Sequence, residues 1–273
     1  MNKEKIFEHL QNHYNELKKH FSENQILGVF LYGSQNYGTD TETSDVDTRA
    51  IYVPSLCDVL FNEPVSKEIV MENGEHCDVK DIREYMKCLK KSNITYMETL
   101  FTKYFIVNPV YEDIWKDTLI KNREGIARTY PFAVLRAMSH TGLNLIKKED
   151  CSGKDLANAL RIYYFLINYL DKKPYEACLF IQNENLRKEL LAIKATPKTN
   201  FNLEKLRNNF NYILSKAGDK NQIDFHYTDN ILKSFVLQCF KRKEKKHFFL
   251  SKIWTISIKP TLLKFTPFWR MFI

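Results

Sequence analysis

The chain has 273 residues, of which 44% are hydrophobic and 27% are charged, with only 8 Gly and 8 Pro. This composition excludes collagen-like, linker-like and low-complexity disordered classes and predicts a globular protein with a real core. The formal net charge of +8 resides at one end, because residues 241–273 hold nine Lys or Arg and one Glu. Residues 1–240 are neutral by formal count, so the body is not interpreted as a basic nucleic-acid-binding surface.

Cysteine usage and hydropathy indicate the cellular setting. The six cysteines form no Cys-x-x-Cys pair and no metal-ligand spacing, and no apolar signal peptide precedes the polar start of the chain. We therefore expect reduced thiols in a cytoplasmic protein without structural zinc. No uninterrupted apolar stretch reaches the ~18 residues that a membrane-spanning helix needs.

The first half of the chain mixes predicted helices and strands. Apolar residues recur every three or four positions over residues 3–21, which predicts an amphipathic helix. Apolar runs or alternating patterns predict three strands, at residues 26–32, 45–53 and 75–80. A helix is expected directly after the third strand, because a capping-box pattern at Asp81 precedes apolar positions through Leu89.

The second half shows helical spacing alone. Five helices are expected, at residues 132–147, 155–171, 184–194, 203–216 and 229–240. No internal repeat of fixed period is visible, which argues against solenoid folds. We therefore predict an α+β protein, in which a mixed sheet with flanking helices is followed by an all-helical domain. The boundaries expected are a catalytic domain at residues 1–125, a helical domain at 126–240 and a basic, aromatic-rich tail at 241–273.

Three histidines, His9, His13 and His20, lie near one another on the first predicted helix. Such a group can bind a metal ion, but the surrounding Asn, Gln and Lys residues favour an ordinary solvated face.

The most informative motif is Gly33-Ser34, followed after ten residues by Asp45-x-Asp47. Two carboxylates on one strand project from the same face at roughly 6.7 Å spacing. Like charges this close are costly unless cations lie between them. Two Mg²⁺ ions about 3.5 to 4 Å apart, each bound by oxygen ligands, meet that need. The alternative is an ordinary surface pair on a strand.

The Gly33-Ser34 turn strengthens the metal interpretation. It follows a buried strand, and glycine permits close backbone approach at such a turn. Its backbone N–H groups and the Ser34 hydroxyl can hold a phosphate. On its own this turn is weak support.

A third carboxylate is expected from the third strand. Cys77 and Val79 would face the core, which leaves Asp78 on the open face. If that strand lies beside the second, Asp78 approaches the first two carboxylates. Asp81 competes for this role, but its place before a helix makes it an N-cap, and Glu75 is a more distant candidate.

These residues resemble the DNA polymerase β nucleotidyltransferase superfamily, whose hallmark is GS, a spacer, DxD and a later third carboxylate. The match here is GSQNYGTDTETSDVD with CDVKD. More closely, GSQNYGT, SDVDTRAIYVP and DVKDIREYMKCLKKSNITYMETL look like the bacterial and bacteriophage predicted nucleotidyltransferase family, some members of which are associated with RNA repair. Asn93 and Glu98 also fit that family's pattern, although a helix C-terminus and a solvated charge explain them as well.

The resemblance extends over about residues 25–180, because CSGKDLANALRIYYFLINYL looks like the family's helical segment. Lys154 and Arg161 lie seven residues apart in it, nearly two turns, and therefore share one helix face. Two cations so placed suit a triphosphate or an RNA phosphate. The alternative is a solvated basic face.

The resemblance implies an enzyme that transfers an NMP from an NTP to an acceptor hydroxyl, with an RNA end favoured, and releases pyrophosphate. Asp45, Asp47 and Asp78 would be the catalytic, metal-binding residues for two Mg²⁺ or Mn²⁺ ions. Four residues would bind the nucleotide: Gly33, Ser34, Lys154 and Arg161. Two alternatives stay open, namely nucleotidylylation of a protein and a non-catalytic nucleotide-binding or RNA-binding module. Three mutually repelling carboxylates argue against the second.

The tail combines the run KRKEKK with seven aromatic residues and lone cations. It could complete the helical core, dock on nucleic acid through Lys and stacked aromatics, or lie on an anionic membrane surface. Pro260 and Pro267 prevent one continuous helix. We favour nucleic acid slightly over a membrane, since the inferred chemistry needs an acceptor.

Overall fold

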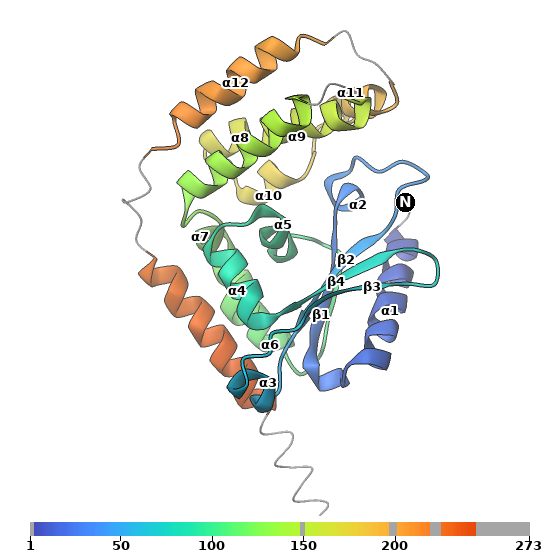
Figure 1. Ribbon diagram of the computed structural model, residues 1–273, viewed down its shortest axis with the longest axis vertical. Coiled ribbons are helices and arrows are strands. Elements are labelled where there is room, and N and C mark those ends of the chain that lie inside the picture. Colours follow the sequence, from blue (N-terminus) through green and yellow to red (C-terminus); the bar gives the residue numbers. More distant parts are fainter. Residues whose placement is uncertain (1–2, 148–150, 197–200, 219–224, 244–273) are drawn as a thin grey trace, which may run out of the picture.

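The computed structural model describes residues 3–147, 151–196, 201–218 and 225–243 (Figure 1). They form a five-stranded mixed sheet with flanking helices, followed by a helical region. The predicted α+β class is therefore confirmed.

The sheet has the strand order β3-β4-β2-β1-β5, and only β2 and β4 pair in parallel. Its strands are β1 (Ile26–Tyr32), β2 (Asp47–Tyr52), β3 (Ser66–Val70), β4 (His76–Asp81) and β5 (Phe105–Val107). The three predicted strands are present, because apolar or alternating runs mark them. The two strands at the sheet edges were not predicted, since β5 has three residues and β3 buries only Ile69.

One face of the sheet is covered by α1 (Lys3–His20), which lies on the far side of the sheet from the helical region in Figure 1. A separate buried cluster joins this helix to the strands, with Leu10 and Leu17 on the helix and Val29, Ala50 and Val79 on the sheet. The apolar positions of α1 recur at helical spacing, which is why the helix buries one face here.

The other face of the sheet continues into the helical region through one cluster of buried side chains, which runs from Leu27 in β1 to Cys239. The helices are α2 (Ser34–Tyr37), α3 (Leu56–Leu60), α4 (Ile82–Lys90), α5 (Ile94–Met97), α6 (Glu112–Ile114), α7 (Arg123–Ala127), α8 (Pro131–Lys147), α9 (Gly153–Leu170), α10 (Tyr175–Leu179), α11 (Glu184–Lys194), α12 (Leu203–Ser215) and a last helix at residues 226–243. Shorter helical turns are η1 (Glu23–Gln25), η2 (Glu98–Leu100), η3 (Trp115–Leu119) and η4 (Ile120–Asn122). Because the core is continuous, the boundary at residue 125 stays a prediction.

The last helix crosses the predicted start of the tail at residue 241. Lys243 is buried, and its Nζ donates to the backbone oxygens of Val53 (3.0 Å) and Pro54 (2.9 Å) just after β2. Residues 241–243 thus belong to the folded body. The rest of the tail, residues 244–273, lies outside the described residues, so its contact with nucleic acid or a membrane remains a prediction.

None of the six cysteines, all of which the structure describes, forms a disulfide. Within the described ranges, no helix combines the length and the apolar character needed to cross a bilayer.

Candidate active site

A cavity of about 560 Å³ lies between the segment at residues 33–47, which joins β1 to β2, and the helices α8, α9 and α11. Its lining brings together Gly33, Ser34, Asp45 and Asp47 from the sheet domain with Lys154, Arg161 and Lys194 from α9 and α11. Six of the seven sequence-predicted site residues therefore share one cavity, and Asp78 is the exception. In Figure 1, α2 projects from the sheet toward α9 and α11, so this short helix lies where the sheet and the helical region approach each other.

The Gly33 turn has a backbone that favours glycine. Gly33 has φ +85°, and Gly38, which ends α2, has φ +80°. Other residues rarely adopt this left-handed region. A Cβ on Gly33 would meet only Asp47 Oδ2 at 3.5 Å, an ordinary contact, so backbone conformation rather than space requires glycine here.

The side chain of Glu98 binds the Gly33 turn through hydrogen bonds. The carboxylate is fully buried; its Oε1 accepts from Gly33 N (3.2 Å) and Asn36 Nδ2 (2.6 Å), and its Oε2 accepts from Tyr37 OH (2.5 Å). Burial raises the pKa of Glu98 to about 7. The interpretation of Glu98 as a solvated charge is wrong. The Gly33 N–H donates to Glu98, so it is already engaged before any phosphate binds.

Asp45 and Asp47 differ in their surroundings. Asp47 begins β2 and is half-buried, whereas Asp45 precedes the strand and is exposed. The expectation that both lie on one strand is wrong for Asp45, because Val46 N donates to Glu75 Oε1 (3.2 Å) rather than to the sheet ladder. Burial, and next the nearby charge of Asp45, raise the pKa of Asp47. An oxygen-seeking cation would relieve this repulsion.

Glu75 supports the aspartate pair from the α1 side of the sheet. Its Oε2 lies 2.8 Å from His9 Nδ1 and 3.0 Å from His13 Nε2. His13 is 1% exposed, and its Nδ1 lies 2.6 Å from Thr48 Oγ1. A solvated helix face is therefore wrong for His13. The two histidines, four residues apart on α1, fix the carboxylate that in turn binds the backbone of Val46.

Asp78 is on the same face of the sheet as Asp47 but engages other groups. The register pairs it with Arg49, two positions beyond Asp47. Asp78 Oδ2 accepts from Tyr96 OH (2.8 Å) and Arg49 Nε (3.3 Å). The Arg49 guanidinium also lies 4.1 Å from the ring centroid of Tyr32 and 4.3 Å from that of Tyr96. Both hydrogen bonds use Oδ2, and Asp78 is not among the residues that line the cavity.

These positions bear on metal binding. Across the part of the chain that the structure describes, no three His, Cys, Asp or Glu side chains are grouped so that they could hold a metal ion. Asp45 and Asp47 are two carboxylates in the cavity lining, and carboxylate oxygens are the ligands that Mg²⁺ prefers. With no third ligand grouped beside them among the described residues, the metal site and the third-ligand role of Asp78 both stay predictions.

Two other residues that the sequence analysis considered for the site, Asp81 and Asn93, cap the starts of helices. Asp81 is fully buried, caps α4 by accepting from Arg83 N (2.8 Å) and forms an ion pair with the Arg83 guanidinium. Its predicted N-cap role is confirmed. Asn93 Oδ1 accepts from Thr95 N (3.2 Å) at the start of α5, and Asn93 N donates to Cys88 O (2.9 Å) at the end of α4. The expected place at a helix C-terminus is therefore confirmed, and Asn93 caps the next helix as well.

The opposite wall of the cavity is cationic. Lys154 is exposed, and Arg161 is half-buried with its guanidinium 3.8 Å from the Tyr37 ring centroid. Lys194 Nζ donates to Thr39 O (2.8 Å), and burial, followed by the charge of Lys154, lowers the pKa of Lys194. Lys194 was not predicted, because nothing in its local sequence shows that α11 brings it beside α9. This wall can bind several phosphates.

The mixed sheet, the glycine turn and the Asp45-x-Asp47 motif are the features in which the chain resembles the nucleotidyltransferase core of the DNA polymerase β superfamily. The sequence model of the RlaP family, described as the RNA repair pathway DNA polymerase beta family, matches residues 3–124. This match confirms the resemblance inferred from the motifs, and it ends before Lys154 and Arg161. No curated protein matches the chain.

Proposed function

We propose that the protein transfers an NMP from an NTP to the hydroxyl of an RNA end and releases pyrophosphate. The observation that carries this proposal is the single cavity in which Asp45 and Asp47 are combined with Lys154, Arg161 and Lys194. Carboxylates there suit divalent cations, and the three basic side chains suit the phosphates of an NTP.

Asp45 and Asp47 would hold Mg²⁺ or Mn²⁺, two ions by the resemblance. Bound there, the metal would neutralise phosphate charge and lower the pKa of the attacking hydroxyl. Asp78 Oδ2 accepts from Arg49 and Tyr96, which leaves its other oxygen, Oδ1, to join this pair. Asp78 does not line the cavity, so a movement of its side chain toward Asp45 and Asp47 is part of the proposal.

In the transfer step, the acceptor oxygen forms a bond to the α-phosphorus while the bond to the α,β-bridging oxygen breaks. The bridging oxygen keeps the electron pair and leaves as part of pyrophosphate, and the hydroxyl proton passes to a carboxylate oxygen of the displaced Asp78. Lys154, Arg161 and Lys194 bind the β- and γ-phosphates. Their charges would lie where the leaving group gains charge, which favours the transition state.

Incubation with each α-labelled NTP, Mg²⁺ or Mn²⁺ and either total RNA or total protein tests this proposal. We expect label in RNA, removable by ribonuclease and absent with Asp47→Asn. Label removed only by protease would establish protein nucleotidylylation instead. NTP binding without any labelled product would favour a non-catalytic binding module.

A further inference from the structure

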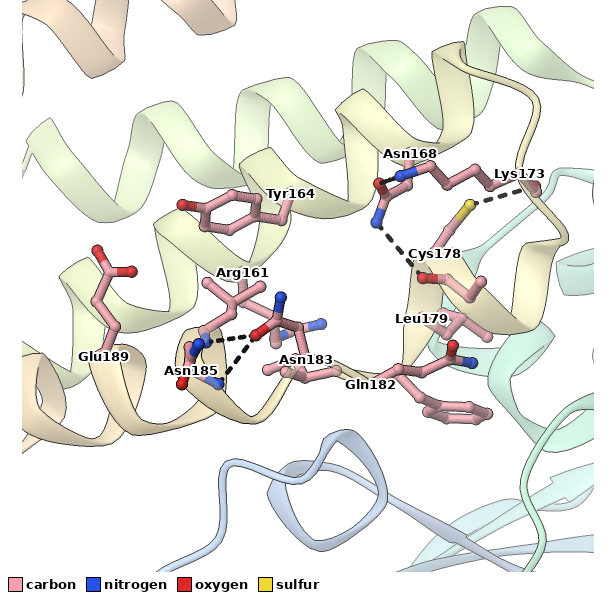
Figure 2. Close-up of a pocket in the computed structure, with 14 residues that line it drawn as sticks. Arg161, Tyr164, Asn168, Lys173, Cys178, Leu179, Gln182, Asn183, Asn185 and Glu189 are labelled. Atoms are coloured by element: carbon pink, nitrogen blue, oxygen red, sulfur yellow. Dashed lines mark hydrogen bonds between the residues drawn. The ribbon is translucent and has the colours of Figure 1, made fainter.

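A second cavity, of about 520 Å³, adjoins the first and shares Arg161 with it. Figure 2 shows this cavity between α9, the chain around α10 and the start of α11. The side chains that matter here are Arg161, Tyr164, Cys178, Leu179, Asn183 and Asn185. Arg161 and Tyr164 belong to one stretch of α9, so the two cavities follow one another along that helix.

The second cavity has an apolar floor and a polar rim. Cys178 and Leu179 are buried, Tyr164 is half-buried, and Asn183 and Asn185 are exposed. The Asn183 side-chain oxygen accepts from Asn185 N (2.9 Å), which leaves its NH₂ group to act as a donor. An apolar surface with a few placed polar groups is typical of small-molecule sites.

Arg161 supplies the link to a charged ligand. Its guanidinium lies over the Tyr37 ring, and its Nε is buried with no hydrogen-bond partner among the residues that the structure describes. An unpaired buried donor is costly, so this nitrogen favours an acceptor from a ligand. Phosphate oxygens match the planar guanidinium in charge and geometry.

We propose that the second cavity binds a second nucleotide, with its phosphate on Arg161 Nε, its base stacked on Tyr164 and the base edge against the amides of Asn183 and Asn185. The terminal N–H groups of Arg161 remain for the NTP in the first cavity, so one guanidinium bridges the two ligands. Aromatic stacking and amide contacts with base edges are how proteins recognise unpaired nucleotides. This inference rests on the proposed function, in which the first cavity holds the NTP. Because the two cavities adjoin at Arg161 and the proposed reaction joins the NTP to an RNA end, the second nucleotide would be the terminal one of the acceptor.

Steady-state transfer to a short RNA provides the first test, with Tyr164→Ala, Tyr164→Phe and the control Tyr212→Ala. Tyr212 is 63% exposed on α12 and does not line either cavity. Tyr164→Ala should raise the KM for RNA roughly 5- to 150-fold, the range for loss of a base stack, with the KM for NTP and kcat unchanged. Tyr164→Phe and Tyr212→Ala should behave as wild type.

Two results of this assay would overturn the inference. A rise in the KM for NTP instead of RNA would make the cavity an extension of the NTP site. Unchanged constants in Tyr164→Ala would show that the cavity holds no reacting nucleotide.

Equilibrium binding of 5′-NMPs to protein saturated with a non-hydrolysable NTP analogue provides the second test. Wild type and Tyr164→Phe should bind one NMP, and Tyr164→Ala should bind it at least about five-fold more weakly. If wild type labels no acceptor, the proposed function fails, while NMP binding that depends on Tyr164 still supports this site. Equal NMP binding by wild type and Tyr164→Ala overturns it.

Discussion

Replacing Glu98 by Gln tests the buried carboxyl that holds the Gly33 turn. Burial raises the pKa of Glu98 to about 7 in the folded protein, against an ordinary value of 4.5. Between these values the folded protein keeps a proton that the unfolded chain has released. The free energy of unfolding contributed by this group therefore falls as the pH rises through this window. At roughly 1.4 kcal/mol for each pH unit, the whole window corresponds to about 3 kcal/mol.

The substitution removes this titration and keeps an acceptor for the N–H of Gly33. Relative to wild type, Glu98→Gln should gain up to about 3 kcal/mol in unfolding free energy between about pH 5 and pH 8. Urea unfolding of both proteins across this range measures the difference, with Glu63→Gln as an exposed control. A difference that stays constant with pH would refute the reasoning, because it would mean that Glu98 titrates alike in folded and unfolded chains.

Three further predictions concern the carboxylates, the cations and the tail. Asp78→Ala should reduce transfer far more than Asp81→Ala, which should instead lower the Tm through loss of a cap worth about 1 kcal/mol and of the Arg83 ion pair; the reverse order would contradict both assignments. Lys154→Ala and the corresponding alanine variant at Arg161 should weaken NTP binding in titrations, with little change in Tm for exposed Lys154; normal NTP binding by both variants would contradict the phosphate-binding role, and earlier melting of the Arg161 variant alone would indicate that Arg161 only packs on Tyr37. Removing residues 244–273 should leave NTP binding nearly unchanged but reduce RNA affinity and flatten its salt dependence. Unfolding of that truncated protein would favour a core role for the tail, and loss of liposome association alone would favour a membrane role.

Local pattern predicted the elements that carry their own signal. β1 begins and ends where the apolar run Ile26–Tyr32 does, because Gly33 follows it. The helices of the second half also lie close to their predicted ranges, since each has apolar residues at helical spacing. β3 and β5 could not be predicted in this way. Their pairing depends on neighbours distant in sequence, and their own residues carry little apolar pattern.

The residues of the candidate site likewise divide into those that a local motif predicted and those that only the folded structure shows. Gly33 and Asp47 were predicted from a motif. The contact of Glu98 was not, because its partner Gly33 is 65 residues away in the sequence, and that of Lys194 was not, because its partner Thr39 is 155 residues away. Only the packed chain shows those contacts. The pairing of Arg49 with Asp78 likewise depends on the register of β2 against β4, which fixes their side chains on one face. Side-chain partners such as Arg49 determine which carboxylate oxygens are left to bind a metal ion or a substrate.

The most direct test of the central claim follows two labels in one reaction. NTP labelled at the α-phosphate or at the γ-phosphate is supplied with Mg²⁺ and RNA to wild type and to Asp47→Asn. Nucleotidyl transfer predicts that the α-label enters RNA and the γ-label appears in pyrophosphate, with neither product formed by Asp47→Asn. Entry of the γ-label into RNA, or equal α-label incorporation by Asp47→Asn, would contradict the account.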